Sequence, residues 1–333
     1  MFNRFLTIST IVLLAVITVI AQPQQQQGQG RPNLSPEEQT LVRNIQSAKD
    51  PAEKMKAVAE MIKKFPKSQA RPFIARMGAE QIEAIQDANQ KLSLAQQYQT
   101  IFNEPTEEEL IFPVLVEAYA SLNQPDEAFK KGADFLSRNP DSLRVLVGLL
   151  ALGTDQVKKQ NGKYLAQSIQ YGTHAAELFE GDKKPANTDD AHWKTYKSGT
   201  LPGVYQSLGL LYYASGKTAE AKANYLKSSE LAPTDPFNFV MLAGLLNQDY
   251  QNEAKQYQSM AAGPARDEEL KKTKAVLDQV IDAYAHAIAL SEGNAPLQQI
   301  RQQYLGDLET YYKYRHGSTE GMQQLIDKYK AKP

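Results

Sequence analysis

The chain of 333 residues contains no cysteine, a single tryptophan and four histidines. The absence of cysteine excludes disulfide bonds, thiol nucleophiles, cysteine-ligated metal sites and a cysteine-linked lipid anchor. The chain also lacks a large excess of either positive or negative charge, because 37 basic residues nearly balance 38 acidic residues. The formal net charge is -1. Nucleic acids require a strongly basic surface, so we expect no nucleic-acid partner.

The chain has enough apolar residues to fold, since 42% of its residues are hydrophobic. Its length exceeds what one compact core holds and suits two domains or one extended array of repeats.

The first 21 residues have the pattern of a secretory signal. Arg4 precedes an uncharged, apolar stretch over residues 5–21, and Val19 and Ala21 occupy the small-residue positions before a cleavage site. We therefore expect residues 1–21 to be a signal peptide and the mature protein to be exported to the periplasm or the extracellular space. The alternative is an inner-membrane anchor formed by an uncleaved segment 5–21, which is near the lower length limit for crossing a bilayer. Membrane association is expected only in that case.

Residues 22–34 form a glutamine-rich leader that has almost no apolar side chains to bury, so we expect it to be disordered. The folded region begins at Ser35, where Pro36 suits the first helical position and Glu38 completes a capping box. Thr106 and Glu109 have the same spacing and predict a second capping box before another helix.

From residue 35 to the end of the chain the apolar pattern is helical, with almost no strand-like alternation. The segment 202–235 is the most informative part. Its characteristic residues are Tyr205, Leu208, Gly209, Tyr212, Gly216, Ala221, Tyr225, Leu231 and Pro233. Gly209 would let a second helix approach closely, and Ala221 would supply the matching small surface. Tyr205, Tyr212 and Tyr225 would fill the space around them. Gly216 would end the first helix in a left-handed turn. This segment resembles a tetratricopeptide repeat (TPR).

The resemblance implies an all-α fold, a right-handed α-solenoid of antiparallel helix pairs, with about six to seven pairs over residues 35–333. Weaker copies cover residues 37–68, 69–105 and 109–142, and in the last of these Gly132 stands where the family has an aromatic residue. Two insertions predict two lengthened helices in the C-terminal half. One begins near Asp189, and the other is mainly the second helix of the repeat that starts near Pro236. These long helices resemble those of TPR proteins of bacterial envelopes, particularly acidobacterial ones.

Few side chains are grouped in a way that indicates catalysis. Asp189, Asp190 and His192 form a tight group of acids and histidine, for which a capped helix start is the commoner explanation. An enzyme with its site near residues 189–193 remains the alternative function. Three acids at residues 107–109 suit the first turn of a helix because they complement its dipole. We therefore expect no catalytic residues, no metal ligands and no cofactor.

Solenoids of this family bind partners on the concave face that their first helices line. The groove positions that the resemblance implies are Val147, Ala151, Gln206, Leu210, Tyr213, Val240, Gly244 and Asn247. These residues are neutral and mostly apolar, which favours an extended or helical peptide with apolar anchors over a terminal carboxylate. The alternative is a face filled by the long helices or by a second copy of the chain, so self-association remains open.

Tyr311, Tyr312 and Tyr314 lie too close in sequence for all three to face one core stripe, so we expect core packing plus one exposed ring. The alternative is a dedicated partner-binding patch at these tyrosines. Together these patterns predict a non-catalytic scaffold or assembly factor of the periplasm or cell envelope that binds a protein or peptide partner.

Overall fold

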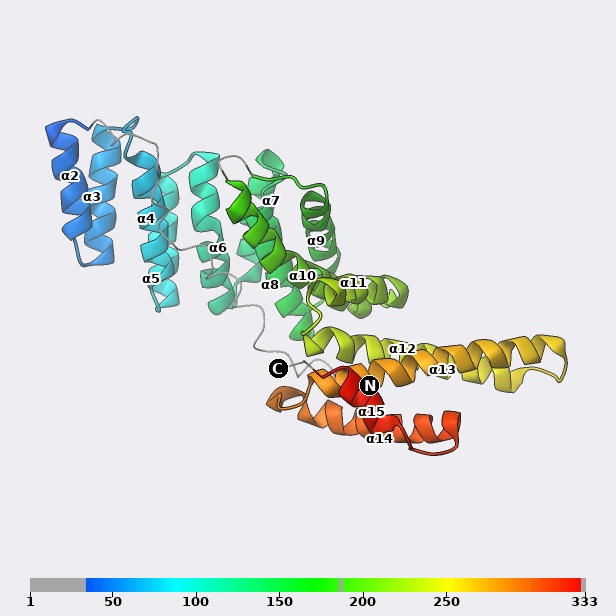
Figure 1. Ribbon diagram of the computed structural model, residues 1–333. Coiled ribbons are helices and arrows are strands. Elements are labelled where there is room, and N and C mark those ends of the chain that lie inside the picture. The colour runs from blue at the N-terminus through cyan, green and yellow to red at the C-terminus, as the bar shows by residue number, and fades with distance from the viewer. Residues whose placement is uncertain (1–33, 186–187, 331–333) are drawn as a thin grey trace. The chain divides into compact units, whose positions relative to one another are not determined.

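The computed structural model describes residues 34–185 and 188–330, and all regular secondary structure in these ranges is helical (Figure 1). The predicted all-α class is confirmed for this part of the chain. The expected signal peptide at residues 1–21 and all but the last residue of the leader lie outside the described residues. Among the described helices, none is long and apolar enough to cross a membrane.

Fourteen α-helices and one short 3-10 helix follow one another along the described chain. Their bounds are α2 (Pro36–Ser47), α3 (Pro51–Lys64), α4 (Arg71–Glu83), α5 (Ala88–Ile101), α6 (Pro105–Ser121), α7 (Pro125–Arg138), α8 (Leu143–Lys158), α9 (Leu165–Glu180), α10 (Asp190–Ala214), α11 (Thr218–Leu231), α12 (Pro236–Ser259), α13 (Pro264–Leu290), η2 (Ala295–Leu297), α14 (Gln298–His316) and α15 (Met322–Lys328).

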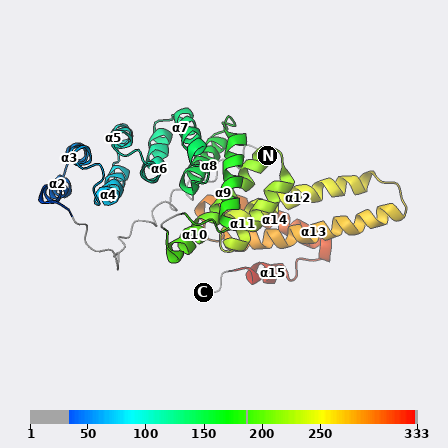
Figure 2. The ribbon, with the colours of Figure 1, turned by 90° about the horizontal axis from the view of Figure 1, so that it is seen from above.

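The described chain divides into two compact units. The N-terminal unit contains residues 34–156 and 170–185, and the C-terminal unit contains residues 157–169 and 189–330. Within each unit, neighbouring helices run antiparallel and pack side by side in chain order (Figures 1 and 2). This arrangement is solenoid-like, because the helices pack mainly against helices one or two places away in the chain.

Local sequence signals set the helix starts. At α2 the Ser35 hydroxyl accepts a hydrogen bond from the Glu38 amide (3.2 Å), and the Glu38 carboxylate accepts one from the Ser35 amide (2.9 Å). The capping box predicted there is confirmed.

The second predicted capping box, at Thr106 and Glu109, is wrong. Helix α6 begins at Pro105, and the box is formed two residues earlier by Glu104 and Glu107. Proline has no amide proton to satisfy and its φ angle already fits a helix, so it favours the first helical position and moves the start upstream.

The close helix crossing predicted at Gly209 is confirmed. A Cβ atom added at Gly209 of α10 would lie 2.9 Å from the ring of Tyr225 on α11. Tyr225 and Ala221 are both fully buried at this crossing. The turn that follows α10 uses Gly216 with a φ of 77°, as the sequence predicted.

In the N-terminal unit, a large side chain of the next helix also packs onto a glycine at two other crossings. A Cβ atom at Gly132 of α7 would lie 2.5 Å from a methyl group of Leu149 on α8. The ring of Tyr98 on α5 likewise packs over Gly78 of α4, at 3.5 Å from such an atom. Gly132, which stands where a TPR has an aromatic residue, thus leaves room for the leucine that the next helix inserts there.

The C-terminal unit contains three long helices rather than the two predicted. Helix α10 has 25 residues and begins after the cap residue Asp189, as expected. The residues added in the next pair are shared between α12, with 24 residues, and α13, with 27. The distal halves of α12 and α13 form a two-helix arm that extends beyond α14 and α15 (Figures 1 and 2).

Helix α15 packs against α13. Ile326 is buried in the core of the C-terminal unit. The ring of Tyr329 stacks on His286 of α13 at 4.2 Å, and its hydroxyl donates a hydrogen bond to Asp282. His286 also contacts Phe239 of α12, with ring centres 3.7 Å apart. Three helices therefore meet at His286.

The expected arrangement of the three C-terminal tyrosines is confirmed. Tyr311 and Tyr312 pack against the core of the C-terminal unit, and Tyr314 is 69% exposed.

Alanine substitutions at two glycines of α10 should have opposite effects on stability. Gly209→Ala places a methyl group against the buried Tyr225 ring and should lower the free energy of unfolding by about 1–3 kcal/mol. Gly203→Ala meets open space and should raise it by about 0.5–1 kcal/mol, because alanine favours a helix over glycine. Urea unfolding of both variants tests this. Equal effects at the two positions would contradict the assigned crossing.

The docking of α15 should weaken in acid through His286. Burial lowers the pKa of His286; the nearby Asp282 opposes this shift and Lys328 adds to it. The neutral imidazole is therefore favoured in the fold, and its stabilisation is present above the ordinary pKa of about 6.5 and is lost as pH falls below that value. Below pH 6.5 the unfolding free energy of the wild type should accordingly fall relative to that of His286→Phe. A difference that stays constant from pH 7.5 to 5 would refute this account.

Candidate partner-binding surface

The three predicted groove positions on α10 differ in how far they are exposed to solvent. Gln206 is buried, and its amide nitrogen donates to Asp235 Oδ2 (2.7 Å) and to Asn238 Oδ1 (3.2 Å). Asp235 is also the N-cap of α12. Gln206 therefore ties α10 to the start of α12, whereas Leu210 and Tyr213 are only half-buried.

Two of the three predicted positions on α12, Val240 and Asn247, contact α14. Val240 is 3% exposed and belongs to the core, and its carbonyl accepts a hydrogen bond from Tyr304 (2.9 Å). The Asn247 side chain accepts a hydrogen bond from the Tyr311 hydroxyl (2.9 Å). Gly244 is partly exposed. Helix α14 thus covers part of the face that α12 was expected to present.

The two remaining positions, Val147 and Ala151, lie on α8 in the N-terminal unit and are both partly exposed. The eight predicted positions are therefore divided between the two units. Within the C-terminal unit, Leu210, Tyr213 and Asn247 lie on helices that the Gln206 contacts connect. The binding role of the whole set stays a prediction.

Tyrosines from α12 and α14 extend this face. Among them are Tyr311 and Tyr314, for which the sequence left a partner-binding patch as the alternative. The rings of Tyr250 and Tyr311 are 5.3 Å apart at 74°. The Tyr311 hydroxyl accepts a hydrogen bond from Gln251 (2.8 Å) while donating to Asn247. Tyr314 adds the most exposed ring. We call Tyr213, Asn247, Tyr250, Gln251, Tyr311 and Tyr314 the tyrosine surface.

The electrostatics of this surface are those of neutral phenols. Burial raises the pKa of Tyr213, and it also contributes most to the raised pKa values of Tyr250 and Tyr311. The pKa of Tyr304 is raised by burial, by Asp307 and by Tyr213, so the α10 tyrosine lies near α14. At physiological pH these hydroxyls therefore act as hydrogen-bond donors and acceptors and carry no charge.

No protein-family model matches this chain, and no curated protein is significantly similar to it. The function of the tyrosine surface must therefore follow from its own chemistry.

The acid and histidine group near residue 190 is a local helix cap. Asp189 Oδ1 accepts a hydrogen bond from the His192 amide (2.9 Å), and Asp189 Oδ2 lies 2.6 Å from His192 Nδ1. Both side chains are about half exposed. Across the described ranges, no group of three or more histidine or acidic side chains is placed to hold a metal ion.

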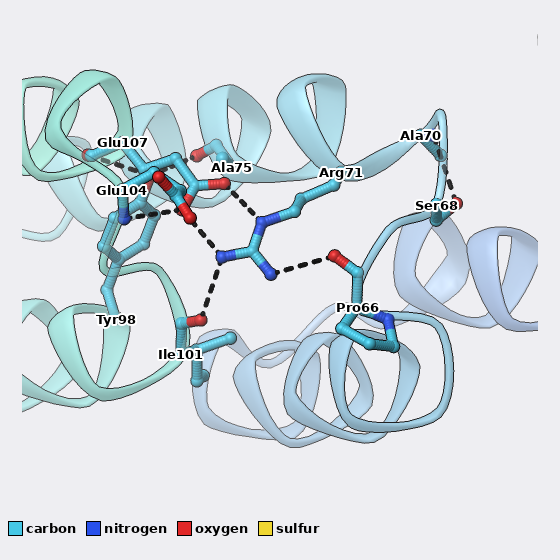
Figure 3. A network of polar contacts seen from close by, with 9 residues as sticks. All are labelled: Pro66, Ser68, Ala70, Arg71, Ala75, Tyr98, Ile101, Glu104 and Glu107. Atoms are coloured by element: carbon cyan, nitrogen blue, oxygen red, sulfur yellow. Dashed lines mark hydrogen bonds and ion pairs between the residues drawn. The ribbon is translucent and has the colours of Figure 1, made fainter.

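A largely buried ion pair in the N-terminal unit joins Arg71 and Glu107 (Figure 3). The guanidinium contacts both carboxylate oxygens, at 2.6 and 2.8 Å, and also donates to the carbonyls of Pro66 and Ile101. The two side chains are only 16% and 8% exposed. Because protein groups already satisfy its donors, this arginine joins α4 to α5 and α6 and is not arranged to bind an anion.

The next two acids of α6, of which only Glu108 lies in the first turn, also hold neighbouring elements. Glu108 pairs with Arg138 at the end of α7 (3.1 Å), and Glu109 accepts a hydrogen bond from Ser142 just before α8 (2.6 Å). The helix dipole accounts for acids at this position, but it did not indicate these partners, which lie about thirty residues away along the chain.

Removing the arginine of this network should destabilise the fold. Arg71→Met leaves the Glu107 carboxylate buried without its partner and should lower the unfolding free energy by about 3 kcal/mol. Replacing both residues, as Arg71→Met with Glu107→Met, should recover most of that loss because no unpaired charge remains.

The control is Lys271→Met, which removes an ion pair whose two side chains are each 73% exposed and should leave the unfolding midpoint unchanged. Guanidinium unfolding of the four proteins provides the comparison. A double variant less stable than Arg71→Met would contradict the explanation that the unpaired charge of Glu107 causes the loss of stability.

Proposed function

We propose that this protein is a non-catalytic interaction scaffold or assembly factor, exported to the periplasm or cell envelope, and that it binds a protein or peptide partner on the tyrosine surface. The observation that carries the proposal is the set of neutral, partly exposed phenols and amides spread over α10, α12 and α14. The apolar stretch 5–21 supports export. The glycine crossings and the succession of fourteen α-helices along the described chain support a right-handed, TPR-like solenoid.

Tyrosine suits a binding surface because its ring offers a large, rigid contact area and its hydroxyl forms directional hydrogen bonds. Here the Tyr311 hydroxyl is already fixed by Asn247 and Gln251, and its ring packs against Tyr250. Side chains held in place lose little conformational entropy when a partner binds. The surface is thus preorganised for contact.

The chemistry of the surface favours an uncharged partner segment. Its six residues carry no formal charge, and Leu210 adds a half-buried apolar side chain beside Tyr213. An extended or helical peptide with apolar anchors could pack on the rings while its polar groups hydrogen-bond to the amides and hydroxyls. Since few charges take part, high salt should weaken this binding little.

Three variants test the proposal, after the partner has been identified by capture from an envelope extract and purified. Leu210→Ala with Tyr213→Ala should weaken its binding at least about tenfold, or 1.4 kcal/mol. Tyr314→Ala should also weaken it, and because that ring is 69% exposed the fold should stay intact. Leu226→Ala on α11 is the matched control, since it removes a 51% exposed apolar side chain from outside the tyrosine surface.

Binding is measured by calorimetry, and folding by circular dichroism. Undiminished binding by the folded Tyr314→Ala and Leu210→Ala/Tyr213→Ala variants would refute the assignment of the surface. The assignment would also be refuted if Leu226→Ala weakened partner binding as much as those variants do.

A further inference from the structure

Helix α15 is attached to the C-terminal unit in the manner of a docked peptide. It has only seven residues, and α13 is its main neighbour (Figure 1). The loop that joins it to α14 begins at Gly317 and ends at Gly321, whose φ angles of 83° and 89° are both left-handed. Isolated helices shorter than about 12–15 residues are not stable in water. Helix α15 therefore depends on its contacts with α13 to stay helical.

The apolar residues of α15 have the spacing of a helix that binds in a groove. Its anchors occupy positions i, i+3, i+4 and i+7, and they are Met322, Leu325, Ile326 and Tyr329. All four pack in or against the apolar core of the C-terminal unit, although only Ile326 is fully buried. Amphipathic helices that bind to other proteins use this same spacing of anchors.

The last anchor occupies a site that fits a tyrosine. Its ring stacks on His286 of α13, with the ring centres 4.2 Å apart and the planes at 14°. Phe239 of α12 contacts the same imidazole, with ring centres 3.7 Å apart. The Tyr329 hydroxyl donates a hydrogen bond to the Asp282 carboxylate, which a phenylalanine at this position could not do.

The charges around this site favour a helix with a basic C-terminal end. Asp282 lies on α13 and Glu292 lies just after it, and both are exposed. Lys330 Nζ lies 3.2 Å from Glu292 Oε2, and Lys328 adds a second positive charge to the same end of α15. Opposite charges at the rim of a binding site set the orientation of the helix that binds there.

Helix α13 is held in place without α15. Its Tyr284 and Ile288 are buried in the core of the C-terminal unit, and the Tyr284 ring packs on Tyr304 of α14 at 4.5 Å. A terminal segment with few buried side chains opens at a lower free-energy cost than such a core does. The α13 surface can therefore persist when α15 leaves.

We propose that the surface under α15 is a second binding site of this protein, which accepts an amphipathic helix of another protein and for which α15 is the intramolecular competitor. We call Phe239, Asp282, His286 and Glu292 the α15 site. The partner helix carries apolar residues at i, i+3 and i+4, tyrosine at i+7 and a lysine beside that tyrosine. The proposal stands whether or not the tyrosine surface binds a partner.

A synthetic peptide with the sequence of residues 318–330 serves as the probe for the full chain, and fluorescence anisotropy measures its binding. The wild type should bind it weakly, because a tethered helix competes at a millimolar effective concentration. Ile326→Asp in the chain places a charge in the core and should release α15. Its affinity for the probe should rise at least about tenfold, since affinity scales with the fraction of open sites.

Gln324→Asp is the matched control, because it adds the same charge at an exposed position of α15 and should bind the probe as the wild type does. Tyr329→Ser is a milder opening variant, since it removes the ring stack and the hydrogen bond from a partly exposed side chain. It should also bind the probe more tightly than the control. Circular dichroism checks that each variant is folded. No gain in affinity by the folded variants would overturn the proposal.

Changes in the probe test the chemistry of the site in the Ile326→Asp chain. Tyr329→Phe in the probe should weaken binding about threefold through the lost hydrogen bond to Asp282. Lys330→Glu in the probe should weaken it as well, because the new acid faces Glu292. A probe whose affinity neither change alters would contradict the assigned site.

The mass of the chain in solution distinguishes a foreign helix from the α15 of a second copy. Light scattering should give the same mass for the wild type and Ile326→Asp. A wild-type dimer that Ile326→Asp abolishes would show that two copies exchange α15, and it would overturn the assignment to another protein.

Discussion

The structure depends on large side chains that pack directly onto glycines of the preceding helix. Tyr98 lies over Gly78, Leu149 over Gly132 and Tyr225 over Gly209, at crossings in both units. At the last two crossings even a methyl group on the glycine would overlap the incoming side chain. Because protein interiors are close-packed, this fit fixes both the distance and the register of the helices that meet there.

Polar contacts at helix starts complement these crossings. Asp235 caps α12 and also holds Gln206 of α10, and Glu107 closes the capping box of α6 while binding Arg71 of α4. A single side chain thus sets where a helix begins and how it lies against an earlier one. In the C-terminal unit this positions α10 against α12, and the contacts of Tyr304 and Tyr311 position α14. The tyrosine surface spans these three helices, so its rings are held by the same contacts that build the fold.

The arm contrasts with the base of the same unit. Near the base, Tyr284, Tyr304 and Ile288 are buried in an apolar core, whereas the seam of the arm relies on Glu253, Glu269 and their neighbours. Regions with little apolar contact open at lower free-energy cost than the core does. The arm can therefore open while the base, and the tyrosine surface on it, keeps its structure.

The sequence by itself determined the helices and the contacts between close neighbours in the chain. Ser35 and Glu38 lie three residues apart, and Gly209 lies one helix before Ala221, so their spacing alone predicted the capping box and the close crossing. The structure then showed that the ring of Tyr225 is the side chain that lies on Gly209. Only the tertiary structure decided which distant helix each side chain reaches. The acids at 107–109, the buried Gln206 and Val240, and the pairing of Asn247 with Tyr311 all involve partners about thirty to sixty residues away. The reason is physical: helical periodicity indicates which face of a helix is apolar, but which neighbour covers that face depends on how all the helices pack together.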